Sequence, residues 1–185
     1  ADVSTFIANP ALIGTPYLGH YAVWRTSGTT GSPGTFVHDR DAVAAYIALL
    51  LVRYYLSWAT RREFWQMVRR RWRVAFVYAT GGHFVSNTFE SIIQQMLPST
   101  KSTAAILSAH LPLPDLVQAL NDTQPAILAT YPSVLAALTE EQAANRLRIS
   151  PLLIATGGET LKTEVRERAA VVFSCKVRDS YSASE

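Results

Sequence analysis

The stretch "AILATYPSVLAALTEEQAANR" at residues 126–146 joins a short apolar run to a longer segment in which apolar residues recur at helical spacing. Residues 126–129 predict a buried strand, and residues 133–146 predict a helix. Pro132 and Ser133 stand between the two, where a strand ends and a helix starts. The stretch therefore predicts a strand, a tight turn and a helix in direct succession.

The same order of strand and helix recurs along the chain after residue 73. Further apolar runs, each followed by turn residues, predict strands at residues 74–78, 104–107, 152–155 and 176–178. Helical periodicity lies between them at residues 85–97, 113–120 and 161–173. This alternation predicts an α/β fold with a largely parallel sheet and helical crossovers. Such sheets bind ligands beyond the carboxyl ends of their strands, so the loops after the strands are the candidate functional loops.

The composition favours one globular lobe over residues 1–185. The chain is 49% hydrophobic and 17% charged, which suffices for a core and argues against disorder. Its single cysteine, Cys175, excludes an internal disulfide and multi-cysteine zinc sites, and we expect a buried thiol rather than a nucleophile. Asp2 and Pro10 interrupt the start where a secretory signal needs an apolar run. We therefore expect a cytoplasmic protein, and the first residue, which is not Met, suggests a processed or excised chain.

Residues 41–59, "DAVAAYIALLLVRYYLSWA", are apolar enough to raise the question of a membrane span. Arg53 lies inside this segment, Asp41 stands at its head, and strand patterns flank it on both sides. A buried or half-buried helix of a globular protein is the favoured interpretation, and we expect no membrane span.

Residues 61–73, "RREFWQMVRRRWR", hold six arginines around Trp65 and Trp72. Arginines interleaved with aromatic rings would suit a polyanion such as single-stranded nucleic acid. The alternative is a solvated helix end whose tryptophans are tucked against the protein. We expect this alternative, and therefore no nucleic-acid partner.

A third distinctive stretch, "RTSGTTGSPGTFVHD" at residues 25–39, is rich in glycine and hydroxyl groups. Glycines allow backbone N–H groups to turn toward one concavity, and hydroxyls add donors that suit phosphate oxygens. The G-x-x-x-x-G-K-[ST] loop does not fit, because Pro33 stands where its second glycine is needed and no lysine follows. Strand patterns on both sides predict a hydroxyl-rich hairpin that holds an anion.

Two predicted strands end in the same letters, "ATGGHF" at residues 79–84 and "ATGGET" at residues 155–160, and the last strand leads into "DSYSASE". A glycine-rich turn after a strand can direct its first N–H groups at a ligand. The final stretch supplies an aromatic ring, a hydroxyl and a carboxylate, which suit adenine, phosphate and Mg²⁺.

The succession "TSGTTGSPG", "TGG", "ATYPSVLAAL", "TGGETL" and "YSASE" resembles the adenylate-forming superfamily, and most closely its phenylacetate-coenzyme A ligase branch with the coenzyme F390 synthetase-like relatives. The resemblance covers nearly the whole chain. It implies ATP- and Mg²⁺-dependent activation of a carboxylic acid, aromatic in this branch, to an acyl-adenylate and transfer to coenzyme A. It also implies an internal fragment of the N-terminal AMP-binding domain, without the mobile C-terminal domain, so that the fragment alone would be inactive.

The resemblance gives nucleotide-binding roles to three motifs. The outer phosphates of ATP would be held by a mobile loop that contains Thr26, Ser27, Gly28, Thr29, Thr30 and Gly31. The wall of the adenine pocket would consist of Gly157, Gly158 and Glu159, with Tyr181 stacked on adenine.

The remaining implied roles concern the reacting centre. Ser184 would contact the α-phosphate and Glu185 would bind Mg²⁺, where charge develops during attack on the α-phosphorus. His83 and Phe84 would line the acyl-substrate pocket.

The sequence departs from the family pattern at three positions. Gly34 stands where many members have lysine, Ser182 replaces the glycine that usually follows the tyrosine, and Ser184 replaces threonine. Part of the charge that neutralises the phosphates is therefore missing from the hairpin.

Other interpretations remain open. His83 is also compatible with a structural role, and Glu159 with an acid in the first turn of the helix that follows it. A hydrolase is disfavoured because the chain has no G-x-S-x-G turn. A nucleotide-binding or scaffolding fragment without turnover is the main alternative to an enzyme.

Overall fold

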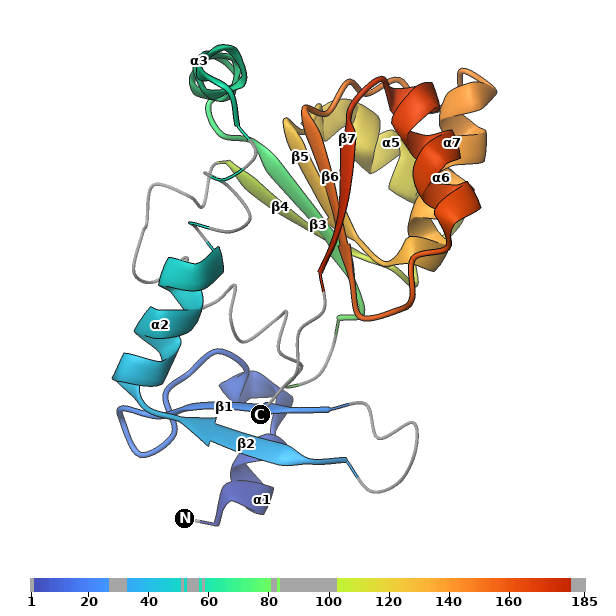
Figure 1. Ribbon diagram of the computed structural model, residues 1–185. Helices are drawn as coiled ribbons and strands as arrows, with labels where there is room; N and C mark the ends of the chain where they lie inside the picture. The colour runs from blue at the N-terminus through green and yellow to red at the C-terminus, as the bar shows by residue number, and fades with distance from the viewer. Residues whose placement is uncertain are drawn as a thin grey trace. The chain divides into compact units, whose positions relative to one another are not determined.

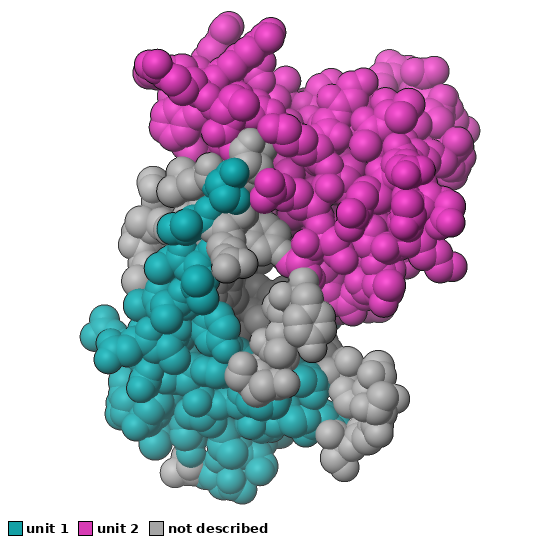
Figure 2. All heavy atoms as spheres, viewed as in Figure 1, with its two compact units in different colours: residues 1–58, 80–100, 183–185 teal, residues 59–79, 101–182 magenta. Residues whose placement is uncertain are grey.

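The computed structural model describes residues 2–26, 33–50, 52, 57, 59–80, 83 and 103–180. Contacts divide the chain into two compact units, which Figure 2 colours separately. The first unit comprises residues 1–58, 80–100 and 183–185, and the second comprises residues 59–79 and 101–182. The single lobe over residues 1–185 remains a prediction, and each unit is described by itself below.

The first unit contains an antiparallel hairpin. β1 (Ala22–Arg25) pairs with β2 (Thr35–His38), so that Ala22 lies opposite His38 and Arg25 opposite Thr35. Ahead of the hairpin lie α1 (Val3–Ile7) and the short 3-10 helix η1 (Pro10–Leu12). The hairpin predicted from residues 25–39 is confirmed, although residues 27–32 of its loop lie outside the described residues.

α2 (Arg40–Leu50) follows the hairpin and packs on it through one side. Its Val43 is buried with Trp24 and Ala22, and Tyr46 packs against this small core. The helix expected over residues 41–59 is thus a half-buried helix as far as Leu50, beyond which most residues lie outside the described part. In the part of the chain that the structure describes, every helix is too short or too polar to span a bilayer.

The second unit is built on a five-stranded parallel sheet with the strand order β4-β3-β5-β6-β7 (Figure 1). The strands are β3 (Val74–Tyr78), β4 (Ala104–Ser108), β5 (Ile127–Thr130), β6 (Leu153–Gly157) and β7 (Lys176–Ser180). All four pairings are parallel. Isoleucine, leucine and alanine fill the buried central strands, as expected of a sheet covered by helices. The predicted α/β fold is confirmed.

Three helices cover one face of this sheet (Figure 1). They are α5 (Leu113–Thr123), α6 (Pro132–Ala143) and α7 (Thr163–Phe173). Leu120 of α5, Leu135 of α6 and Phe173 of α7 are buried in one apolar cluster with Leu128 and Ile154 of the sheet. Burial of each such side chain contributes about 1.5–3 kcal/mol, so this layer supplies much of the stability of the second unit.

The helix ends differ from the predicted ones by two or three residues, for local reasons. α6 ends at Ala143 rather than at residue 146, because Asn145 adopts a left-handed φ of 59° that a helix cannot continue. α7 begins at Thr163 rather than at residue 161, because the N-cap residue Lys162 has an extended backbone with a ψ of 143°. The helix predicted over residues 85–97 lies outside the described residues.

α3 (Arg61–Arg69) precedes β3 and carries most of the arginine cluster. A capping box fixes its start, since the Thr60 hydroxyl accepts the Glu63 N–H and the Glu63 carboxylate accepts the Thr60 N–H. Met67 faces the core with 1% of its surface exposed, whereas Trp65 is 62% exposed. The expectation that both tryptophans are tucked against the protein is wrong, since Trp72 is also 37% exposed. Trp65 points away from Met67 because two positions along a helix rotate a side chain by about 200°.

Candidate functional site

The carboxyl edge of the parallel sheet gathers the loops that the sequence singles out. Tyr78, Thr130, Gly157 and Ser180 end four neighbouring strands, and the register aligns these ends. The chain therefore leaves all four strands at one edge of the sheet. The stretches that follow there begin with "ATGGHF", "YPS", "GET" and "YSASE".

A topological switch point lies between β3 and β5. The chain continues from β3 to β4 on one side, and from β5 to β6 on the other side. Two adjacent strands whose connections diverge open a crevice at their carboxyl ends, where ligands of such sheets bind. Tyr78 ends β3, and Tyr131 follows β5 directly, so both lie at this switch point.

Tyr131 contacts both neighbouring strand ends at this edge and was not among the residues selected from the sequence. Its ring packs edge-on against Tyr78, with ring centroids 4.9 Å apart. Its phenolic oxygen accepts a hydrogen bond from the Ala79 N–H at 3.4 Å. From the sequence, the "YPS" turn indicated only the end of a strand and the start of a helix. The signal that could have identified Tyr131 is its position directly after a strand in the middle of the sheet. The structure thus adds an aromatic pair to the candidate site.

Gly157 and Gly158 are held by close neighbours. A Cβ atom on Gly157 would come within 2.8 Å of the Ser180 Oγ, and one on Gly158 within 2.9 Å of the Tyr131 Cε1 atom. Gly158 also has a φ of 80°, in the left-handed region that favours glycine. Both glycines are therefore required by packing at the strand end, whatever ligand their backbone faces.

Glu159 binds the start of a neighbouring helix. Its carboxylate accepts hydrogen bonds from the Ser133 backbone N–H at 2.9 Å and from the Ser133 hydroxyl at 3.0 Å. Ser133 lies in the first turn of α6, whose own N-cap residue, Tyr131, makes no side-chain capping bond. The alternative that Glu159 serves the helix after it is wrong, because α7 begins only at Thr163. A carboxylate at the N-terminus of α6 is favoured by the unpaired N–H groups and the helix dipole there.

Hydrogen bonds also fix the end of β7 beside β6. The Thr156 hydroxyl donates to the Asp179 carboxylate at 2.8 Å, and the Ser180 hydroxyl donates to the Thr156 carbonyl oxygen at 3.1 Å. These bonds hold the strand up to the residue before Tyr181. They tie the end of β7 to the end of β6.

In the first unit, Thr26 closes the base of the hydroxyl-rich loop. Its N–H donates to the Gly34 carbonyl oxygen at 3.0 Å, and its hydroxyl accepts the Gly34 N–H at 2.9 Å. A Cβ atom on Gly34 would come within 3.0 Å of the Phe36 ring. Gly34 therefore lies under an aromatic ring.

His83 is buried in the first unit, with 2% of its surface exposed. Its Nε2 atom lies 3.2 Å from the Asn9 carbonyl oxygen, and its ring packs against Phe6 at 5.4 Å between centroids. Its backbone carbonyl accepts the Arg25 N–H at 2.8 Å, which ties it to the end of β1. Its Nδ1 atom is buried without a hydrogen-bond partner among the described residues. The His83 ring thus makes structural contacts with Asn9 and Phe6, while its Nδ1 atom has no partner in the described part of the chain.

The other predicted site residues lie outside the described residues. They are Ser27, Gly28, Thr29, Thr30 and Gly31 of the phosphate loop, Phe84 of the substrate pocket, and Tyr181, Ser184 and Glu185 of the last stretch. Their roles remain predictions.

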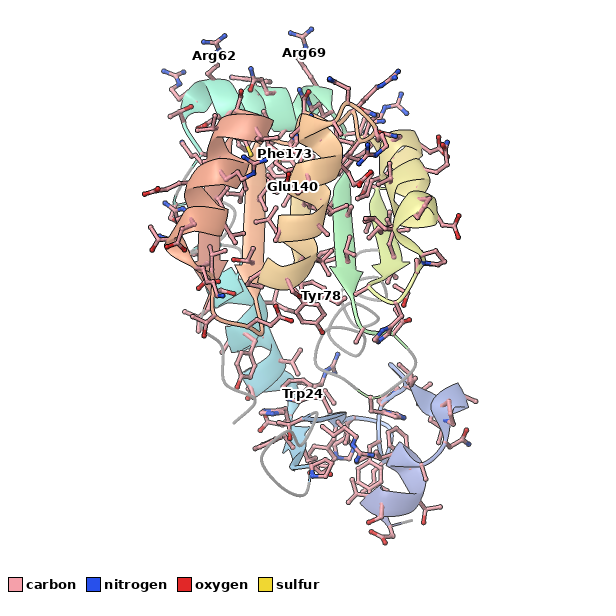
Figure 3. All side chains as sticks on the ribbon, turned by 90° about the vertical axis from the view of Figure 1, so that its right-hand side faces the viewer. Trp24, Arg62, Arg69, Tyr78, Glu140 and Phe173 are labelled. Atoms are coloured by element: carbon pink, nitrogen blue, oxygen red, sulfur yellow. The ribbon has the colours of Figure 1, made fainter. Side chains whose placement is uncertain are left out.

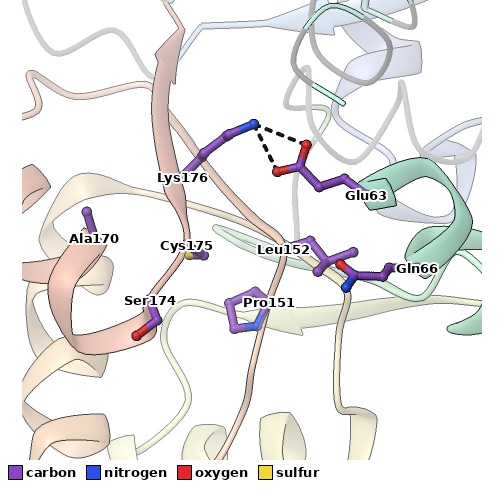
Figure 4. A pocket seen from close by; sticks show the side chains of 8 residues that line it. All are labelled: Glu63, Gln66, Pro151, Leu152, Ala170, Ser174, Cys175 and Lys176. Carbon is purple, nitrogen blue, oxygen red and sulfur yellow. Dashed lines mark hydrogen bonds and ion pairs between the residues drawn. The ribbon is translucent and has the colours of Figure 1, made fainter. Parts of the chain in front are cut away.

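A hollow of about 400 Å³ lies at the opposite, amino-terminal edge of the sheet (Figure 4). The Lys176 ammonium group contacts the Glu63 carboxylate at its rim, at 2.9 Å. Cys175 lines it, and burial raises the pKa of this thiol to about 12. Such a thiol is unreactive at neutral pH, as expected of a cysteine that is not a nucleophile, although Cys175 is half-buried rather than fully buried.

No family model matches the chain, and no curated protein matches it. Solved structures do. A malonyl-CoA ligase with methylmalonyl-CoA and AMP bound has a TM-score of 0.59 at 20% identity, over 88% of this chain and 32% of that one. A 2-hydroxyisobutyryl-CoA ligase in complex with 2-HIB-AMP and CoA has a TM-score of 0.57 at 19% identity, over 92% and 35%.

An o-succinylbenzoate CoA synthetase from Bacillus subtilis has a TM-score of 0.54 at 17% identity, over 81% of this chain and 27% of that one. The chain thus spans about a third of the length of the solved proteins that it matches. The parallel sheet and the hairpin that precedes it in the sequence have the fold of the N-terminal part of adenylate-forming acyl-CoA ligases.

Proposed function

We propose that this chain supplies nucleotide- and acid-binding elements of a ligase that activates a carboxylic acid with ATP, forming an acyl-adenylate and pyrophosphate, and then transfers the acyl group to coenzyme A. The observation that carries the proposal is the contact of Tyr131 with Gly158 and Tyr78 at the switch point of a sheet with the acyl-CoA ligase fold. Ligases of this fold have been solved with AMP, an acyl-adenylate or CoA bound.

The chemistry requires groups that stabilise negative charge. When the acid carboxylate attacks the α-phosphorus of ATP, charge develops on the α-phosphate oxygens and on the departing pyrophosphate. Backbone N–H groups and hydroxyls of the loop after Thr26 would hold the outer phosphates, and Ser184 would hold the α-phosphate. Mg²⁺ bound by Glu185 would neutralise further charge when present. β7, the strand that precedes them in the sequence, is fixed to Thr156 of β6 through Asp179 and Ser180.

The adenine ring would lie against the backbone of Gly157 and Gly158 and stack on Tyr181. Glu159 contributes to this wall through α6, because its carboxylate ties the glycine loop to Ser133 at the helix start. It is therefore proposed as a positioning residue of the adenine pocket. A loop fixed at both ends presents its N–H and C=O groups to the base without a further loss of backbone entropy.

An aromatic acid is the proposed substrate class, within the phenylacetate-coenzyme A ligase branch. Tyr78 and Tyr131 together present two rings at an edge-on angle of 86°, an arrangement in which another aromatic ring packs favourably. His83, whose buried Nδ1 atom has no partner in the described part of the chain, is a candidate hydrogen-bond donor or acceptor to the acid, and Phe84 is a candidate lining residue.

The test is ATP–pyrophosphate exchange in a protein that contains this chain together with the rest of such a ligase. We expect exchange that depends on an aromatic acid and exceeds that with aliphatic acids and amino acids. Tyr131→Ala should raise KM for the acid more than tenfold while KM for ATP changes little, and Tyr131→Phe should restore most of the affinity. ATP binding without acid-dependent exchange would contradict the proposal and indicate a nucleotide-binding module without turnover.

A further inference from the structure

The outward side of α3 and the turn after it form an exposed surface of rings and guanidinium groups, here called the aromatic-arginine surface. It consists of Arg61, Arg62, Phe64, Trp65, Arg69 and Trp72. Phe64 is 40% exposed and Trp72 37% exposed, and Trp65 is the most exposed of the three rings. Three large aromatic side chains on one short segment are far more than the single scattered apolar residues of an ordinary protein surface.

The opposite side of α3 is fixed to the second unit, so the exposure of this surface is built into the fold. Met67 is buried, the Glu63 carboxylate binds Lys176 of β7, and the Arg70 guanidinium donates to the Ser150 carbonyl oxygen. The helix cannot rotate to bury Trp65 without breaking these contacts. The rings therefore face outward because the structure holds them there.

The turn after α3 completes the aromatic part of the surface. Arg71 and Trp72 have left-handed φ values of 54° and 52°, which reverse the chain direction. The Trp72 ring thereby packs on Phe64 at 5.7 Å between centroids, and Phe64 packs on Trp65 at 6.1 Å. Backbone strain at two successive residues without glycine is costly, and here it yields a preassembled cluster of exposed rings.

The charge of this surface is strongly positive. Six arginines and a single acid, Glu63, occur over residues 61–73, and Glu63 is paired with Lys176. Within the described part of the chain, no carboxylate pairs with Arg61, Arg62 or Arg69. A partner of negative charge is therefore favoured, and a second copy of the same surface is disfavoured by repulsion.

The geometry selects among negative partners. Neighbouring rings stand at 77° and 79° to one another, so they offer no succession of parallel faces on which nucleic-acid bases stack. The surface is the convex outside of a helix, and the hollow nearby is lined from its other side by Glu63 and Gln66. Tryptophan and phenylalanine with flanking arginines are the residues that bind the headgroup region of anionic bilayers.

We propose that the aromatic-arginine surface docks the protein on an anionic phospholipid bilayer, with Trp65 inserted at headgroup depth and Arg62 and Arg69 on lipid phosphates. Figure 3 shows Arg62 and Arg69 directed away from the sheet at one of its edges, while Tyr78 lies at the other edge. Docking would leave the carboxyl edge of the sheet uncovered. The proposal does not depend on the proposed ligase function and is tested without any substrate.

The experiment is cosedimentation of the 185-residue chain with two kinds of vesicle. One consists of phosphatidylcholine alone, and in the other about one lipid in three is phosphatidylserine. We expect binding to the anionic vesicles only, weakened by raising the salt from about 0.05 to 0.5 M, since screening shortens the reach of surface charges. Arg62→Gln/Arg69→Gln should lower the partition coefficient at least about tenfold, because each arginine near such a surface contributes about 1 kcal/mol. Trp65→Phe should abolish most of the vesicle-induced blue shift of tryptophan fluorescence.

Matched controls lie on α7 and at its N-cap, outside the residues that define this surface. Lys162→Gln/Arg166→Gln removes two exposed charges, and Val171→Ala removes an apolar side chain that is 78% exposed. Both should bind vesicles as the unmodified chain does, and circular dichroism should show every variant folded. The proposal is overturned if the α7 variants lose as much binding as the α3 variants. It is equally overturned if a single-stranded oligonucleotide binds and anionic vesicles do not, or if neither binds.

Discussion

The phenol ring of Tyr131 lies against Gly158 so closely that a Cβ atom on the glycine would come within 2.9 Å of the ring. This contact joins the end of β5 to the end of β6 across the candidate site. Because Gly158 also has a positive φ, it is constrained in two separable ways.

Gly158→Ala should lower the free energy of unfolding by about 2–3 kcal/mol, of which roughly 1–2 kcal/mol comes from the left-handed backbone and the rest from the clash. Urea denaturation measures the loss. Gly19→Ala is the matched control, since Gly19 has a φ of 79° and no atom within 4 Å of its would-be Cβ. It should show the backbone cost alone. Equal losses in the two variants would mean that the Tyr131 contact carries no energy.

Glu159→Gln should lower the free energy of unfolding by about 1 kcal/mol, because an amide binds the N-terminus of α6 less strongly than a carboxylate does. Ser133→Ala should cost a similar amount, and the double variant should cost less than their sum, since they share one interaction. Glu167→Gln, an exposed acid in the middle of α7, is the control. Additive losses would show that the Glu159–Ser133 bonds do not form in solution.

Glu63 should give the second unit a stability that depends on pH. Burial raises the pKa of this carboxyl, but hydrogen bonds from Thr60 and Lys176 outweigh burial and hold it below the ordinary value of 4.5. A lowered pKa in the folded state stabilises the protein above pH 4.5, and this contribution is lost as the pH falls through the folded value. The difference in unfolding free energy between the unmodified chain and Glu63→Gln should therefore shrink from pH 6 to pH 3. If this difference in unfolding free energy did not change with pH, the proposed contribution of the Glu63 carboxylate would be contradicted.

Cys175 should resist alkylation at pH 8 in the folded protein and react quickly in urea. Its pKa rises to about 12 on burial, so the folded state keeps the proton that the unfolded state loses above about pH 9. Stability should accordingly fall as the pH rises from 9 toward 12, and this loss should be smaller in Cys175→Ala. Reaction of the native protein at the rate of a free thiol would refute the burial.

The proposed ligase function predicts that Tyr181→Ala weakens ATP binding by about 1–3 kcal/mol in a protein that contains this chain, while Tyr181→Phe costs much less. The reason is that stacking on adenine uses the ring and not the hydroxyl. Isothermal titration calorimetry with ATP gives both values. Equal losses for the two variants would indicate a hydrogen-bonding tyrosine and remove the adenine role.

The succession of strands and helices was predictable because it depends on local patterns. The apolar run at residues 126–129 and the turn at Pro132 are visible in the sequence, and β5 and α6 begin within one residue of their predicted starts. Strand ends at one edge followed from the parallel topology alone. The end of β3 was therefore located correctly and that of β5 within one residue, whereas β6 and β7 each run two residues past their predicted ends, to Gly157 and Ser180.

Side-chain partners were not predictable, because they depend on the order of strands in the sheet. Tyr131 contacts Gly158 only because β5 and β6 are neighbours, and Glu159 reaches Ser133 for the same reason. The exposure of Trp65 depends on which side of α3 packs against the rest of the second unit. The sequence of α3 alone does not predict that side, because aromatic residues occur on two sides of the helix.

The ion pair between Glu63 and Lys176 joins residues 113 positions apart and ties α3 to the last strand of the sheet. On the ribosome, where about 5–20 residues are added per second, Lys176 is made roughly 6–23 s after Glu63. During this interval α3 has its capping box, but Glu63 lacks its partner Lys176 on β7. The side of α3 that carries Met67 is then not fully covered by the sheet. Nascent chains paused between these two points should therefore be the form of this protein most exposed to chaperones and proteases.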